Sequence, residues 1–270
     1  MERLRRQPSP DESVQRVALD LAESHSVSRQ PGRGRTIRLR LQGLDHSFSA
    51  VYRTLQADPE AADAHPRIAE WLLDNEYLIR EAVRQVASGL PPNYYRRLPR
   101  LSVGPEPDLP RVVDLARVAA WESRLQVDPD QLQHFLASYQ EIRSLEIGEL
   151  WAIPSALRLA VLEAVAAAAE DIFGSGPTVT ARHSVPGAPG AGASPADALT
   201  VIAAGIGSLR TLSAHDWRRF VESASRVERI LRGDPSRTYA SMDFETRDRY
   251  RRAVEELARG SGEPEDAVAR

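Results

Sequence analysis

The chain contains neither cysteine nor lysine among its 270 residues. Without cysteine it can form no disulfide bond, no thiolate zinc site and no cysteine nucleophile. Without lysine it has no Schiff-base chemistry and no phosphate-loop lysine. Its folding stability must therefore come from side-chain packing, and arginine supplies every strongly basic side chain.

A strong net charge is also lacking, because 35 arginines and 38 acidic residues leave a formal charge of -3. This balance argues against a nucleic-acid partner, which would need a strongly basic face. No apolar run follows the charged first residues, so no secretory signal is predicted. The most apolar stretch, 147–169, is interrupted by charged residues and Pro154, which predicts a buried core helix and no transmembrane span.

The apolar share of 42% indicates a globular protein. Residues 1–12 are rich in proline and charge and are predicted to form a disordered tail. Residues 174–194 are rich in glycine, proline and alanine, which predicts a flexible linker. This linker would separate an N-terminal helical subdomain, 13–173, from a C-terminal one, 195–270.

Apolar residues recur at helical spacing in most of the chain, and no window shows strand alternation between hairpin turns. The predicted class is all-α, a bundle or array of about eight or nine helices without a sheet. The predicted helices cover residues 13–24, 36–57, 65–88, 109–123, 131–141, 144–173, 195–212, 214–231 and 242–259. The proline-rich residues 90–101 are predicted to run as an extended loop.

Candidate metal sites are weak. Asp128 and Asp130 form a DxD pattern, which can hold a divalent cation, but the proline between them and the following helix favour an N-cap. The six histidines lie at positions 25, 46, 65, 134, 183 and 215. None of them has the i, i+4 spacing that places two imidazoles on one helical face, so neither a metal nor a cofactor is predicted.

Glycine, serine and tryptophan give no catalytic signature. Gly205 and Gly207 resemble part of a phosphate loop, but no strand precedes them and close helix packing is the better interpretation. No serine lies in a G-x-S-x-G elbow. The tryptophans are interpreted as packing residues, with sugar stacking as the alternative; they are Trp71, Trp121, Trp151 and Trp217.

Three carboxylates, Asp74, Glu149 and Glu163, lie within apolar helix faces. Buried charges are usually paired, so a structural partner such as Arg158 is the favoured interpretation. The alternative is acid–base work by carboxylates in unusual environments. No catalytic residue is assigned.

Four segments together resemble the bacterial cyclic β-1,2-glucan synthases. They are AEWLLDNEYLIREAVRQV (69–86), LPPNYYRRLPRL (90–101), HFLASYQEIRSLEIGELWAIPSALRLAVLEAV (134–165) and a stretch from LRTLSAHDW to RRAVEELAR (209–259). The segments occur in the family's order and cover more than half of the chain. IGELWAIPSALRL and YASMDFETRDRYR are the most specific of the matching patterns.

The resemblance implies the family's N-terminal helical region, on the cytoplasmic side before the first membrane span and the glycosyltransferase domain. The family polymerises glucose from UDP-glucose and later cyclises and trims the chain, with domains that these 270 residues do not contain. Residues 174–194 replace a longer helical stretch of the family. The chain is expected to be a gene fragment, a remnant or a free-standing module.

The leading hypothesis is a non-catalytic accessory or scaffold module that docks onto a membrane-bound glucan synthase or its transferase domain. It would lie in the cytoplasm, at the inner membrane through that partner. The motif residues expected to fix helix packing are Trp71, Asp74, Asn75, Tyr94, Tyr95, Gly148, Glu149, Trp151, Arg158, Trp217, Asp243, Arg247 and Tyr250.

Two alternatives remain open at this stage. An independent sugar-binding protein or carbohydrate-active enzyme would need two carboxyl groups about 5 to 10 Å apart in one open cleft. A plain interaction protein without a link to glucan is the third possibility.

Overall fold

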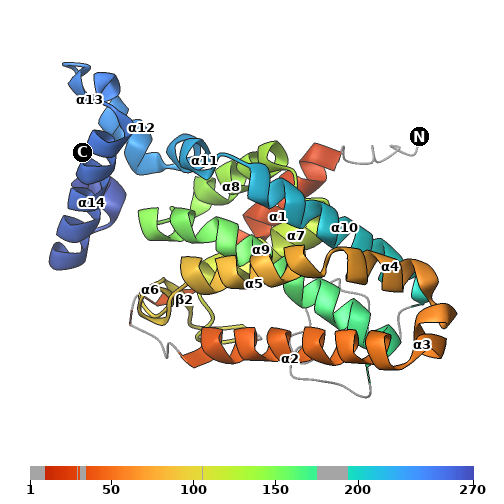
Figure 1. Cartoon of the computed structure of the whole chain (residues 1–270). Coiled ribbons are helices and arrows are strands. Elements are labelled where there is room, and N and C mark those ends of the chain that lie inside the picture. Colours follow the sequence, from red (N-terminus) through yellow and green to blue (C-terminus); the bar gives the residue numbers. More distant parts are fainter. Residues whose placement is uncertain (1–9, 29, 31–34, 105, 175–193) are drawn as a thin grey trace, which may run out of the picture. The chain divides into compact units, whose positions relative to one another are not determined.

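The computed structural model describes residues 10–28, 30, 35–104, 106–174 and 194–270. These residues form fifteen helices and one antiparallel ladder of two short strands, so the chain is mostly α-helical (Figure 1). The helices are α1 (Pro10–Ser24), α2 (Arg35–Ala57), α3 (Pro59–Ala64), α4 (Pro66–Asp74), α5 (Glu76–Gly89), α6 (Pro92–Tyr95), α7 (Arg111–Glu122), α8 (Pro129–Ile142), α9 (Ile147–Phe173), α10 (Pro195–Ala214), α11 (Trp217–Ala224), α12 (Arg226–Arg232), α13 (Thr238–Ser241), α14 (Phe244–Ser261) and α15 (Glu265–Val268).

The described residues hold more helices than predicted because two long predicted helices are broken and because the short helices α3, α6, α13 and α15 lie outside the nine predicted ranges. The stretch 65–88 divides at Asn75 into α4 and α5, and 214–231 divides at Ser225 into α11 and α12. Ser225 has extended backbone angles and its side chain accepts a hydrogen bond from the backbone N–H of Glu228, as an N-cap does. A local cap therefore overrides the continuous apolar pattern.

Three other predictions need correction. Residues 10–12 of the predicted tail begin α1, and residues 1–9 lie outside the described part. The predicted loop 90–101 contains α6, which starts with a proline in its first turn, where proline is tolerated. It also contains β2 (Arg100–Leu101), which pairs with β1 (Val27–Ser28) and so adds a two-residue ladder to the predicted sheet-free fold.

The chain divides into two compact units, each assembled from separate segments. Of the described residues, unit 1 contains 10–25, 129–151 and 216–270, and unit 2 contains those between 26 and 128 and between 152 and 215. These units do not follow the predicted division into 13–173 and 195–270, because both predicted subdomains contribute to each unit. The predicted linker, except for its end residues 174 and 194, lies outside the described residues.

In unit 1, α1 packs against α8, and helices α11 to α15 follow one another. Tyr139 of α8 and His25 share a hydrogen bond of 2.8 Å between the phenol oxygen and Nδ1, and Arg143 Nε donates to the Ala22 carbonyl at 2.6 Å. A second small core holds Ile147, Val227 and Val254. The C-terminal segment is therefore joined to the start of α9 by apolar packing.

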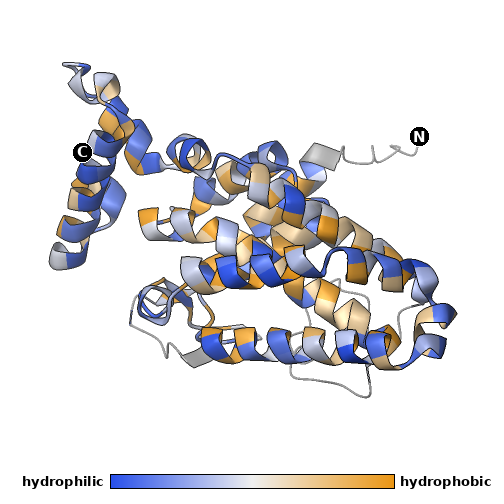
Figure 2. Ribbon diagram, in the orientation of Figure 1, coloured by the Kyte–Doolittle hydropathy of each residue, from blue (hydrophilic) through white to orange (hydrophobic). Residues whose placement is uncertain are grey.

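In unit 2, α10 runs alongside α4 and α5, and α2 alongside α5 (Figure 1). Most of α9 belongs to this unit and is almost fully buried from Ala152 onward. Figure 2 shows α9 as pale to orange along most of its length, whereas α14 is largely blue. Among the described residues, α9 alone is long and apolar enough to cross a membrane, and 94% of its most apolar window is buried inside the structure. Burial of this kind is typical of a core helix, as predicted.

The α9–α10 contact depends on one of the two glycines singled out in the sequence. A Cβ on Gly205 would lie 2.4 Å from Val165 Cγ2, whereas a Cβ on Gly207 would meet nothing within 4 Å. The prediction of close helix packing is therefore confirmed for Gly205 and wrong for Gly207.

These two glycines provide a matched test. We expect Gly205→Ala to lower the free energy of unfolding by about 1–3 kcal/mol, because α10 must move away from α9. Gly207→Ala should leave it unchanged or raise it by up to about 1 kcal/mol, because alanine is the better helix former. Urea unfolding followed by circular dichroism measures both, and equal losses in the two variants would contradict the packing argument.

Candidate functional site

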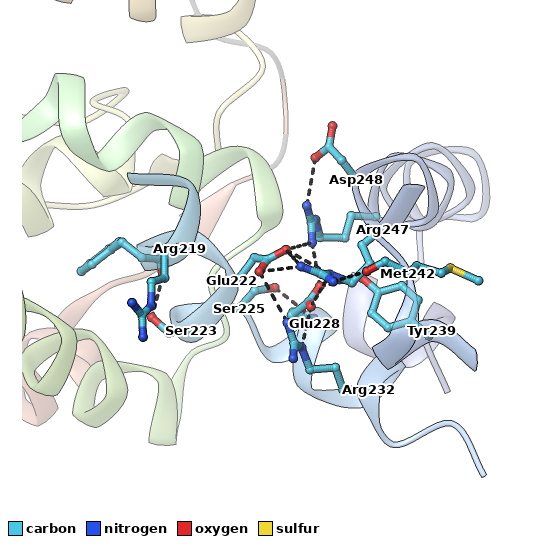
Figure 3. A network of polar contacts seen from close by, with 12 residues as sticks. Arg219, Glu222, Ser223, Ser225, Glu228, Arg232, Tyr239, Met242, Arg247 and Asp248 are labelled. Atoms are coloured by element: carbon cyan, nitrogen blue, oxygen red, sulfur yellow. Dashed lines mark hydrogen bonds and ion pairs between the residues drawn. The ribbon is translucent and has the colours of Figure 1, made fainter. Parts of the chain in front are cut away.

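Unit 1 contains an ionic network, here called the C-terminal network, which consists of Glu222, Glu228, Arg232, Arg247 and Arg251. Glu222 lies on α11, Glu228 and Arg232 on α12, and the other two arginines on α14. Figure 3 shows the two carboxylates pointing toward Arg232 and Arg247. The network therefore joins α11, α12 and α14 through charge pairs.

Its contacts are short and its centre is buried. Arg247 Nη2 lies 2.8 and 3.0 Å from the two carboxylate oxygens of Glu222, a forked contact. Arg251 Nη1 donates to Glu228 Oε2 at 2.7 Å, and Arg232 Nε donates to Glu228 Oε1 at 2.7 Å. The side chains of Arg251 and Glu228 are 0% and 1% exposed.

Tyr239 of α13 completes the network by donating its hydroxyl to Glu228 Oε2 at 2.6 Å. Burial by itself would raise the pKa of Glu228, but the hydrogen bonds from Tyr239, Arg251 and Arg232 outweigh it and lower that pKa. Glu228 is thereby held ionised and fully hydrogen-bonded. This state favours a structural role over proton transfer.

The predicted motif residues of α14 surround this network. Asp243 is the N-cap of α14 and accepts a hydrogen bond from the Thr246 backbone N–H at 2.8 Å. Arg247 is part of the network, and Tyr250, which is 48% exposed, meets Tyr239 edge to face with ring centroids 5.8 Å apart. Asp243 therefore caps α14, Arg247 belongs to the network, and Tyr250 contacts Tyr239 beside it.

A second ionic cluster, here called the buried quartet, lies in unit 2 and consists of Arg40, Glu106, Arg117 and Glu163. Arg40 comes from α2, Arg117 from α7 and Glu163 from α9, whereas Glu106 precedes α7. The Glu163 carboxylate accepts hydrogen bonds from Arg40 Nη1 at 2.7 Å and from Arg117 Nη2 at 2.9 Å. Glu106 receives Arg117 Nη1 at 2.6 Å and also pairs with Arg40 Nη2.

The quartet is a closed ring of alternating charges. Burial alone would raise the pKa of Glu163, but Arg117 and Arg40 outweigh it and hold that pKa below its usual range. Pairing of Glu163 is therefore confirmed, although Arg158 is not its partner. The alternative interpretation, acid–base work by Glu163, is disfavoured because both of its carboxylate oxygens are engaged.

Arg158 instead binds carbonyl oxygens within unit 2. Its Nη2 donates to the Leu212 carbonyl in the last turn of α10 at 2.7 Å, and its Nη1 donates to Pro154 at 3.0 Å. A cation at a helix C-terminus is favoured by the helix dipole and satisfies carbonyls without helical partners. Burial lowers the pKa of this guanidinium. The prediction of a carboxylate partner for Arg158 was wrong.

The other predicted motif residues of unit 2 lie at helix junctions. Asn75, which is 4% exposed, joins α4 to α10, because Nδ2 donates to the Trp71 carbonyl at 2.8 Å and Oδ1 accepts from Arg210 Nη2 at 2.6 Å. Asp74 is exposed, so its placement in a buried face was wrong. Tyr95 is fully buried and Tyr94 is half-buried.

The remaining predicted residues of unit 1 lie near the start of α9. Glu149 is fully buried, and its Oε2 accepts a hydrogen bond from the Glu146 backbone N–H at 2.9 Å. Gly148 and Trp151 are half-buried, and Trp151 meets Phe244 edge to face at 6.5 Å. The aromatic pair brings the start of α9 beside α14.

All four tryptophans are half-buried. Trp217, for example, packs its ring edge against Phe220 with centroids 5.1 Å apart. Within the described part of the chain, no group of three or more histidine, aspartate or glutamate side chains is arranged to hold a metal ion. Asp128 directly precedes α8, and His183 lies outside the described residues.

Sequence reasoning missed most members of both clusters. Those residues are Arg40, Glu106, Arg117, Glu222, Glu228, Arg232 and Arg251. One signal was available, because Arg40 follows Ile37 by three residues and precedes Leu44 by four, which places a charge on the buried face of α2. A charged residue at such a position needs a partner.

The sequence is 29% identical to the cyclic β-(1,2)-glucan synthase NdvB of Rhizobium meliloti (strain 1021) over an alignment of 297 positions. This alignment covers 86% of the chain but 10% of the synthase, so the chain spans about a tenth of that relative's length. A comparison with profiles of known protein families gives no match. The chain is therefore related, over most of its own length, to a cyclic β-1,2-glucan synthase.

Proposed function

We propose that this chain is a non-catalytic helical module of a glucan-synthesising system, which docks onto a membrane-bound glucan synthase or its transferase domain. The observation that carries the proposal is the engagement of the buried carboxylates. Glu163 is held by two arginines, Glu228 by arginines and a tyrosine, and Glu149 by a backbone N–H. Interiors of this kind fix helices relative to one another, and none of these three carboxylates is poised as a general acid or base.

The relation to the synthase supports the choice of partner. It extends over most of this chain and a small part of the relative, as expected for a module that serves a larger enzyme. We place the chain at the inner face of the bacterial inner membrane, held there through that partner. The same relation fits a fragment or a stand-alone remnant of a synthase gene.

Two exposed apolar pairs are candidate contact points for the partner. Leu73 and Tyr77, in unit 2, are 41% and 70% exposed, and Tyr250 and Leu257, on α14 in unit 1, are 48% and 63% exposed. Exposed large apolar side chains that lie a few turns apart are common where a protein meets a partner. None of them is a core residue, but Tyr250 also packs against Tyr239, so circular dichroism must show that its variant keeps the fold.

The test uses the full chain and the detergent-solubilised cognate synthase. We expect the tagged chain to retain the synthase on an affinity resin and to change the rate of glucosyl transfer from UDP-glucose. The double variants Leu73→Ser with Tyr77→Ser, and Tyr250→Ser with Leu257→Ser, should show which unit docks, because one of them should lose retention while its helical circular dichroism is unchanged. Failure of the unaltered chain to bind the synthase at micromolar concentrations would refute the proposal.

A thermal melt with glucan, UDP-glucose and Mg²⁺ tests the alternative of an independent sugar-binding protein or enzyme. A rise in the unfolding midpoint with any of these compounds would support that alternative, since a ligand that binds the folded state stabilises it. An unchanged midpoint supports the scaffold role.

A further inference from the structure

The C-terminal helix α15 packs against other elements of unit 1. Val268 and Ala269 pack against the small core of Ile147, Val227 and Val254, and α15 contacts α12 and α14. This segment is short, so its attachment depends on few interactions. A change in one of them can release it.

One of these interactions comes from a buried carboxyl group. Glu265, the first residue of α15, is 8% exposed, and its Oε2 accepts a hydrogen bond from the Ile147 backbone N–H at 2.7 Å. Ile147 begins the 27-residue helix α9, whose first N–H groups have no partner within the helix. Glu265 therefore links the last helix of the chain to the start of α9.

The charged groups that face Glu265 are acidic. Glu146 immediately precedes α9, Glu149 lies in the first turn of α9, and Glu255 lies on α14, where it pairs with Arg259. On α12, Glu228 and Arg232 are engaged in the C-terminal network, and on α15 itself Asp266 pairs with Arg270. Among the described residues, no arginine forms an ion pair with Glu265.

We propose that α15 is a proton-dependent latch, which is closed while the Glu265 carboxyl group is protonated and is released when that group ionises. The hydrogen bond from Ile147 uses Oε2, so the proton can reside on Oε1 without disturbing it. Ionisation would place a buried negative charge close to the acidic side chains of Glu146, Glu149 and Glu255, where repulsion and lost hydration favour release.

The electrostatics of the site give the pH window. Burial, together with Glu146 and Glu255, raises the pKa of Glu265 to about 8, although the Ile147 N–H opposes this. The usual value is 4.5, which we take for the released state. The protonated carboxyl group therefore contributes its full stabilisation of the closed state below pH 4.5. This stabilisation is lost as the pH rises through about 8. Within this window the released fraction should increase about tenfold per pH unit.

A single engineered thiol can report release, because the chain has no cysteine. Val268→Cys places that thiol where α15 packs on the core, and an uncharged aromatic disulfide labels it in the full chain. The matched control carries Glu265→Gln in addition to Val268→Cys. Dividing the labelling rate of the first variant by that of the control removes the pH dependence of the thiol itself, because both proteins have the same cysteine. We expect the ratio of the rate with Glu265 intact to the rate in this control to rise about tenfold per pH unit between about pH 6 and about pH 8 and then to level off.

A ratio that stays constant over this range would overturn the latch. A second measurement avoids any effect of the cysteine on the core, because it compares the unaltered chain with Glu265→Gln. The urea midpoint of the unaltered chain should fall as the pH rises from about 6 to about 8, and that of Glu265→Gln should change much less. Parallel pH profiles of the two proteins would also overturn the proposal.

Discussion

Replacing Glu163 by glutamine is expected to lower the free energy of unfolding by about 3–5 kcal/mol, because it removes one charge from a buried set and leaves Arg40 and Arg117 under-compensated. The side chains of these two arginines are each 4% exposed, so water cannot replace the lost carboxylate. Glu106, which is 28% exposed, remains as their single anionic partner in the quartet. Urea unfolding at neutral pH measures the loss.

Glu81 provides the matched control. It is 44% exposed and pairs with Arg84 on the surface of α5. The same change of carboxylate to amide, Glu81→Gln, should leave the free energy of unfolding nearly unchanged, because exposed ion pairs contribute little. Equal losses in the two variants would show that the quartet does not stabilise unit 2.

The pH dependence of the Glu163 contribution has a defined sign. Because its folded-state pKa is lowered, the contribution is present above the usual value of 4.5 and is lost as the pH falls through the lower folded-state value. We therefore expect the difference in stability between the unaltered chain and Glu163→Gln to shrink as acid is added. A difference that does not change in acid would contradict this linkage.

Replacing Arg251 by methionine is expected to cost about 3 kcal/mol or more. Arg251 is fully buried and binds Glu228 and Glu222, so its loss leaves two carboxylates under-compensated beneath α14. Its guanidinium also lies 5.0 Å from the centre of the Phe244 ring, a further favourable contact that methionine loses in part. Arg232 and Arg247 still pair with the carboxylates and limit the damage.

The neighbouring Arg252 is the control for this prediction. Its side chain is 72% exposed and pairs with Asp248 at 2.8 Å. Arg252→Met should change the free energy of unfolding by less than about 0.5 kcal/mol. Since both substitutions remove one positive charge from the same turn of α14, a comparable loss in the two variants would contradict a network-specific role.

The helices themselves were predictable where local signals agreed. The spacing of Ile37, Leu44 and Val51 predicted α2 almost to its ends, and α9 was predicted from a long apolar stretch, in which the helix continues through Pro154. The breaks at Asn75 and Ser225 were missed. At both, a polar side chain that binds backbone atoms decides between one helix and two, and apolar periodicity does not register that choice.

The sequence by itself determined the all-α class, the exclusion of thiol and amine chemistry and the relation to the glucan synthases, because composition and local pattern contain that information. Only the tertiary structure decided the partners of the buried charges. Arg40 and Glu163 are 123 residues apart, and their pairing depends on how α2 and α9 pack. Arg158 likewise meets Leu212 in place of a carboxylate because the end of α10 lies beside it. A charge on an apolar face reveals that it needs a partner, but the fold determines which partner it meets.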